Sequence, residues 1–193
     1  MNLPKIIYYK ILSKLITRKN VDYKRKKFED RNVLERIIFP YALAHFKLKT
    51  VLDIGREDYQ KFYNEFFKNK ELWTMDVNSK RKEFGANNHI TDNVSNLEKH
   101  FKKNYFDFIL MNGVFGWGLN KKEDIEKTFA SIHKILKPGG LFILGWNDVE
   151  DLTPVLLKNI EALKKFKPFI FPPLKTEQFK CETGEHTYNF YTK

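Results

Sequence analysis

The chain has 193 residues, 42% of them hydrophobic and 16% aromatic, which suffices for one packed domain with a short appendage. Its 18 Phe, 9 Tyr and 3 Trp exclude a disordered chain, and a single cysteine excludes a disulfide framework and a cysteine-rich zinc site. The net charge of +11 allows an anionic partner such as nucleic acid, a lipid surface or an acidic substrate. No apolar run is long enough to span a membrane, and the lone cysteine fits a reducing compartment, so we expect a cytoplasmic protein.

The N-terminal segment is basic and amphipathic. Residues 5–18 are predicted to be a helix, with Ile7, Ile11 or Leu12, and Leu15 at helical spacing beside a row of basic side chains. Residues 1–30 hold nine basic and three acidic residues, so they carry more than half of the net charge. We therefore divide the chain into an N-terminal appendage, residues 1–30, and a folded domain, residues 31–193. Residues 1–20 are expected either to touch an anionic membrane surface, on its inner face, or a partner, or to pack as a lysine-rich helix on the domain's edge.

The composition of the basic residues argues against nucleic acid as the partner. Arginine supplies only 6 of the 35 basic residues, and lysine supplies the other 29. The planar guanidinium of arginine binds phosphates and base edges better than the ammonium group of lysine does. A surface that binds nucleic acid should therefore contain more arginine.

Beyond a polar linker at 19–31, the pattern alternates between helices and apolar strands. Strands are predicted at 50–54, 72–76, 89–91, 105–112 and 141–146, followed by a hairpin of 177–183 with 186–192. Helices are predicted at 32–46, 57–69, 79–84, 94–103, 121–136 and 150–165. Continuous apolar strands between helices indicate a buried parallel sheet, whose ligands bind beyond the carboxyl ends of the strands.

Four of these segments, in this order, resemble the class I S-adenosylmethionine-dependent methyltransferases. The matching segments are Val51–Gly55, Trp73–Asp76, Tyr105–Asn112 and Ile135–Leu144, and the resemblance covers residues 48–192. It implies a Rossmann-like α/β fold: a seven-stranded, mostly parallel sheet with an antiparallel last strand and helices on both faces. It also implies S-adenosylmethionine as the cofactor.

The resemblance carries cofactor-binding roles onto residues at the strand ends. Gly55 would let the backbone approach the cofactor, and Asp53 would help to hold its ammonium group. Asp76 ends the second strand and suits the two ribose hydroxyls, with a helix-capping acid as the alternative. Asp92 would contact the adenine amino group or cap the next helix.

At the end of the fourth strand, Asn112 and Gly113 would lie beside the reactive methyl group. The first motif departs from the family, because Glu57 and Tyr59 stand where the second and third glycines are usual. These side chains crowd the methionine end of the cofactor, while Arg56 offsets the acidic charge. The departure indicates altered cofactor binding, and it keeps open a non-catalytic domain of the same fold.

The methyl acceptor is expected to bind at the loops after the fourth and fifth strands. Asp148 and His186 are candidate proton acceptors; the alternatives are a helix cap and an incidental histidine. No metal site is expected, because the five histidines show no ligand-like spacing. The acceptor site is expected to be shaped by Phe115, Trp117, Trp146 and Asn147, with packing of the loop over the core as the alternative.

Together these features favour a methyltransferase of a small molecule or a glycan precursor, acting by in-line transfer as a monomer or homodimer. An RNA methyltransferase stays an alternative on charge alone. The signature of enzymes that methylate amino groups of nucleic acids does not follow the fourth strand, which continues as Asn112–Phe115.

Overall fold

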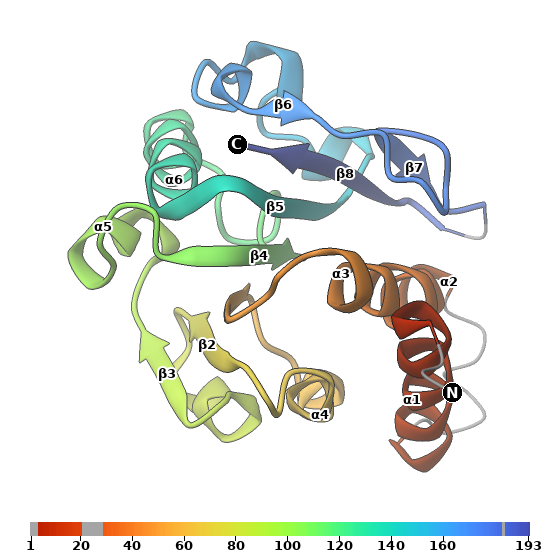
Figure 1. The fold of residues 1–193 in the computed structure, drawn as a ribbon. Coiled ribbons are helices and arrows are strands. Elements are labelled where there is room, and N and C mark those ends of the chain that lie inside the picture. The colour runs from red at the N-terminus through yellow and green to blue at the C-terminus, as the bar shows by residue number, and fades with distance from the viewer. Residues whose placement is uncertain (1–3, 21–28, 183) are drawn as a thin grey trace.

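The protein is built on one twisted sheet (Figure 1). The computed structural model describes residues 4–20, 29–182 and 184–193. Within them the sheet has eight strands in the order β3-β2-β1-β4-β5-β8-β6, with β7 also paired to β8. The strands are β1 Thr50–Ile54, β2 Glu71–Asp76, β3 Asn88–Thr91, β4 Phe106–Asn112, β5 Leu136–Asn147, β6 Lys167–Pro168, β7 Gln178–Lys180 and β8 His186–Thr192.

Strand directions confirm the predicted fold class. The first five strands are parallel to their neighbours, and β8 runs antiparallel beside β5. The described sheet has one strand more than the seven expected, because the short β6 and β7 both pair with β8. The hairpin of β7 with β8 is confirmed, although Thr183 in its turn lies outside the described residues.

Helices cover both faces of the sheet (Figure 1). The helices α1 to α4 pack on one face and α5 and α6 on the other. A π-helical turn, Leu34–Ile38, joins α2 to α3, so one helical segment stands where a helix over 32–46 was expected. The α-helices are α1 Lys5–Asn20, α2 Glu29–Val33, α3 Phe39–His45, α4 Tyr63–Phe66, α5 Leu97–His100 and α6 Lys122–Ile135.

The strand β4 shows why the sheet is buried on both sides. Phe108 and Leu110 belong to the core under α1–α4, whereas Ile109 and Met111 belong to the core under α5 and α6. Successive side chains of a strand point to opposite faces, so a continuous apolar run serves both cores. The sheet therefore presents its polar residues at the strand ends.

Some predicted helices were wrong in extent. The stretch 57–69 forms a 3-10 turn, Asp58–Gln60, and the one-turn α4; the stretch 94–103 forms a 3-10 turn, Val94–Asn96, and α5. The expected helix at 150–165 is replaced by short 3-10 turns. Pro154 cannot continue a helix there. The carboxylate of Glu126 in α6 also accepts hydrogen bonds from the backbone amides of Glu161 and Ala162 in that stretch, both at 2.8 Å.

The N-terminal helix α1 is packed on the domain along one side. Ser13, Ile16 and Thr17 are buried, and the Ser13 hydroxyl donates to the Glu35 carbonyl at 2.6 Å. Of the predicted linker, residues 21–28 lie outside the described part, and 29–31 begin α2. No helix in the described ranges is long and apolar enough to cross a bilayer.

Candidate functional site

A cavity of about 570 Å³ opens at the carboxyl ends of β1, β2 and β4. Its walls come from strand ends, from the loops that follow them, and from α2. This volume lies within the roughly 300–1,000 Å³ typical of small-molecule sites. Of the predicted site residues, those that line it are Gly55, Asp76, Asp92, Asn112, Gly113, Trp117, Asn147 and His186.

Gly55 stands where the chain after β1 passes close to the end of β4. It has a φ of 87°, in the left-handed region that favours glycine. A Cβ at this position would lie 2.6 Å from the Val114 side chain and 2.9 Å from the Asn112 carbonyl oxygen. The chain after β1 therefore passes tightly against the end of β4, which brings the backbone to the cavity wall.

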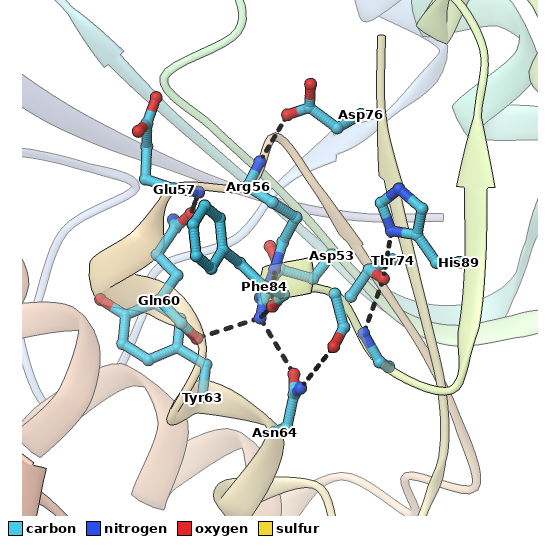
Figure 2. Close-up of polar contacts among 12 residues, drawn as sticks. Asp53, Arg56, Glu57, Gln60, Tyr63, Asn64, Thr74, Asp76, Phe84 and His89 are labelled. Carbon is cyan, nitrogen blue, oxygen red and sulfur yellow. Dashed lines mark hydrogen bonds and ion pairs between the residues drawn. The ribbon is translucent and has the colours of Figure 1, made fainter. Parts of the chain in front are cut away.

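Asp76 is held rigidly at the end of β2. The backbone amide of Arg56 donates to one carboxylate oxygen at 2.8 Å (Figure 2). The backbone amide of Asn78 donates to the other, also at 2.8 Å. Each carboxylate oxygen keeps a further acceptor position. A preorganised carboxylate that lines the cavity in this way is suited to a pair of hydroxyl donors.

Asp53 does not line the cavity; the contact with the cofactor's ammonium group that was expected of it, directly or through water, stays a prediction. Asp53 is 2% exposed and forms an ion pair with the buried guanidinium of Arg56 (Figure 2). Burial raises the pKa of Asp53, and the positive charge of Arg56 works against that rise. Arg56 itself lines the cavity, but its guanidinium is buried and paired with Asp53, while Glu57 pairs with Arg81.

The guanidinium of Arg56 also ties together two loops. It donates to the carbonyls of Gln60 at 3.0 Å and Phe84 at 2.6 Å, and to the side chain of Asn64 at 2.9 Å (Figure 2). This network holds the segment after β1 against the turn before β3. It explains how the chain keeps the loop shape here with a single glycine in the motif.

Glu57 stands at the position of the second glycine in the family's first motif, and it forms an ion pair with Arg81. Its side chain also caps the 3-10 turn Asp58–Gln60, while its own amide donates to the Gln60 side chain at 2.6 Å. The three-residue turn stands where the helix over 57–69 was expected to begin. The cavity wall here is formed by side chains instead of a glycine-rich helix start.

Two residues of α2 enter the cavity wall, and sequence reasoning missed both. Asp30 and Arg31 line it, and the Arg31 guanidinium lies 3.8 Å from the centroid of the Tyr59 ring. Gln60 and Arg81 were missed as well. No local signal marks these residues, because only the packing of α2 across the strand ends brings the first pair to the site.

Asp92 is fixed by hydrogen bonds on the far side of the cavity. The Asn96 amide, the His100 ring and the backbone amide of Asn93 lower its pKa to about 2. Asn93, and not Asp92, caps the following 3-10 turn. The Asp92 carboxylate is therefore ionised at neutral pH and lines the cavity.

His186 sits between two amide side chains at the other end. Its Nε2 lies 2.9 Å from Oδ1 of Asn112, and its Nδ1 lies 3.2 Å from Oδ1 of Asn147. Burial is the largest influence on this imidazole and lowers its pKa, so the ring is neutral at pH 7. Gly145 makes room for the contact, because a Cβ there would lie 2.0 Å from the Asn112 oxygen.

Two predicted acceptor-site residues and one candidate proton acceptor lie outside the cavity wall. Phe115 and Trp146 are buried and pack edge to face at 5.6 Å, and the Trp146 indole donates to Asn189 at 2.9 Å. Asp148 lies outside the cavity wall, with Lys180 at 3.4 Å. Trp117 is at the mouth and 62% exposed. No cluster that could hold a metal occurs in the described part of the chain.

Comparisons with known proteins agree with this geometry. Residues 52–144 match a family model described as "Methyltransferase domain". The N-methyltransferase NodS of Bradyrhizobium japonicum in complex with S-adenosyl-L-homocysteine superposes with a TM-score of 0.60 at 16% identity, covering 94% of this chain and 97% of that one. No curated protein sequence matches the chain.

Two further solved structures have the same fold. A TehB-like methyltransferase of Corynebacterium glutamicum gives a TM-score of 0.60 at 15% identity, covering 97% of both chains. The 1,6-didemethyltoxoflavin N1-methyltransferase of Burkholderia thailandensis gives 0.58 at 16%, covering 100% of this chain and 91% of that one. With the matched domain at residues 52–144, the chain is similar to the class I S-adenosylmethionine-dependent methyltransferases and shares their fold.

Proposed function

We propose that the protein transfers a methyl group from S-adenosylmethionine to a small-molecule or glycan-precursor acceptor. The observation that carries the proposal is one cavity lined both by a fixed carboxylate, Asp76, and by the half-buried imidazole of His186, which contacts Asn112. When bound, the cofactor supplies an electrophilic methyl group on a sulfonium, so the protein's main task is alignment.

The chain's own residues suit each part of the cofactor. The Asp76 carboxylate accepts the ribose hydroxyls, and the ionised Asp92 accepts the adenine amino group. Gly55 gives the backbone access that the methionine part needs. Arg31 supplies the positive charge for its carboxylate, in place of the amides of a glycine-rich loop.

His186 is the proton acceptor at the methyl end. A hydroxyl or amine acceptor must lose a proton. In a neutral imidazole whose Nε2–H donates to Oδ1 of Asn112, Nδ1 is the nitrogen that can take it. The acceptor is a small molecule because the cavity is of that size and Trp117 narrows its mouth. The Burkholderia thailandensis enzyme of the same fold, with 1,6-didemethyltoxoflavin bound, supports a compact acceptor.

The proposal is tested in two steps. Calorimetry with S-adenosylhomocysteine should give saturable binding, and no heat at millimolar ligand would contradict an enzyme and favour the non-catalytic alternative. Radiolabelled methyl transfer from S-adenosylmethionine is then measured into the small-molecule fraction and into the RNA of a cell extract. Label in the small-molecule fraction supports the proposal, whereas label confined to RNA contradicts it.

The acid side of the pH–rate profile should depend on His186. Because burial lowers the pKa of this imidazole below 6.5, kcat should stay level from pH 8 to 7 and fall only at more acidic pH, as the ring takes up a proton. His186→Gln should lower kcat by roughly 100-fold and remove that acid limb, with little change in S-adenosylhomocysteine affinity. An unchanged pH profile in the variant would assign the base elsewhere.

Gly145→Ala should disturb the methyl end without touching the ribose end. The new Cβ would lie 2.0 Å from the Asn112 oxygen and 2.9 Å from His186 Nε2, so that pair must separate. We expect kcat to fall while S-adenosylhomocysteine affinity is kept. The matched control is Gly184→Ala, whose nearest contact is 3.9 Å away. Equal kcat in both variants would contradict a role for the Asn112–His186 contact.

A further inference from the structure

The helix α1 exposes a continuous apolar stripe to solvent. The exposed fractions are 40% for Ile7, 53% for Tyr8, 48% for Ile11 and 58% for Leu15. Helical spacing places these four side chains on one face. Isolated exposed apolar residues are ordinary, but four on one face of one helix form a patch.

The opposite face of α1 fixes this orientation. Ser13, Ile16 and Thr17 are buried there, and the Ser13 hydroxyl bonds the Glu35 carbonyl at 2.6 Å. At the end of the helix, the Asn20 amide donates to the Glu65 carboxylate at 3.0 Å. The apolar stripe therefore cannot turn inward while the domain is folded.

Positive charge borders the stripe. Helix α1 holds five basic residues and no acidic one; the basic residues are Lys5, Lys10, Lys14, Arg18 and Lys19. Lys14 and Arg18 share a shallow hollow with Ile11 and Leu15, and Arg36 closes its other side. The surface is thus apolar along its middle and cationic along its borders.

We propose that this face of α1 docks on an anionic lipid surface. An interfacial helix buries its apolar face at the boundary between head groups and acyl chains, while basic side chains meet anionic head groups. A second copy of this chain fits poorly, because a two-fold contact would oppose the same cations.

Docking would place the catalytic cavity next to the membrane. Asp30 and Arg31 line the cavity, and Asn32 and Arg36 line the hollow beside the stripe. One continuous helical segment, α2 with the turn Leu34–Ile38, therefore borders both surfaces. An acceptor made or carried at the membrane would meet the cavity without crossing bulk solvent.

The test is co-sedimentation of the full chain with vesicles of phosphatidylcholine alone and of phosphatidylcholine with phosphatidylglycerol. We expect binding to the anionic vesicles only, weakening as salt rises. The variant K10Q/K14Q/R18Q should lower the partition coefficient by roughly 100-fold, at about 1 kcal/mol for each basic residue near the surface. The variant I11S/L15S should also reduce binding, because it removes the apolar part of the contact.

The matched control is K122Q/K127Q/K158Q, which removes the same charge from exposed positions on other parts of the fold. This control should keep most of the wild-type partition coefficient on the anionic vesicles. Thermal melting checks that all variants fold. The proposal is overturned if the control loses as much binding as K10Q/K14Q/R18Q, if neutral vesicles bind equally well, or if no vesicle binds. Light scattering that shows an α1-dependent dimer in place of vesicle binding would assign the face to a second copy.

Discussion

Asp76→Ala should weaken binding of S-adenosylhomocysteine by about 10- to 100-fold, measured by calorimetry. The carboxylate is the acceptor proposed for the two ribose hydroxyls, and hydrogen bonds to a charged group contribute roughly 1.5–3 kcal/mol. Its two backbone partners, the amides of Arg56 and Asn78, hold it in place before any ligand arrives. The loss should therefore appear in affinity and scarcely in the geometry of the rest of the cavity.

A matched variant separates lost recognition from lost structure. Asp151→Ala removes an exposed acid that does not line the cavity, so it should keep wild-type affinity. Asp76→Asn keeps one oxygen for the amide of Arg56 or Asn78 and should bind with intermediate affinity. If Asp76→Ala binds as wild type does, the ribose site has been placed wrongly. If its thermal midpoint without ligand falls sharply, the amide contacts account for the effect.

The sheet could be predicted from sequence because its strands carry their own signal. An apolar run such as Phe106–Asn112 indicates a strand that is buried on both faces. Its periodicity and length are therefore enough to predict the strand. The helices over 57–69 and 150–165 failed because tertiary contacts decide them: the guanidinium of Arg56 fixes the first stretch, and Glu126 takes backbone amides of the second.

The site residues could be predicted from the sequence only where they lie at the ends of strands. Asp76 and Asn112 terminate parallel strands, so topology alone brings them to one edge of the sheet. Phe115 and Trp146 looked alike in sequence to Trp117, yet only Trp117 reaches the cavity. Arg31 was missed because α2 crosses the strand ends, and no local pattern in the sequence records that packing.

Arg56→Met should lower the free energy of unfolding by roughly 3–5 kcal/mol, measured by urea denaturation. Removing one partner of a buried ion pair leaves the other charge uncompensated. Here Asp53 would stay 2% exposed with no cation, and the carbonyl oxygen of Phe84 and the side chain of Asn64 would lose their donor.

The double variant Asp53→Asn with Arg56→Met should regain part of that loss, because the unpaired charge is gone. This outcome distinguishes a structural arginine from a ligand-binding one. If the guanidinium of Arg56 held the cofactor's carboxylate, Arg56→Met would lower affinity with little effect on unfolding, and the double variant would recover nothing. A loss of stability below about 1 kcal/mol would contradict the buried pair as the anchor of this loop. The expected pattern instead explains how the loop keeps its shape with one glycine where the motif usually has three. The hydrogen bonds of the Arg56 guanidinium hold the loop that the other glycines otherwise shape.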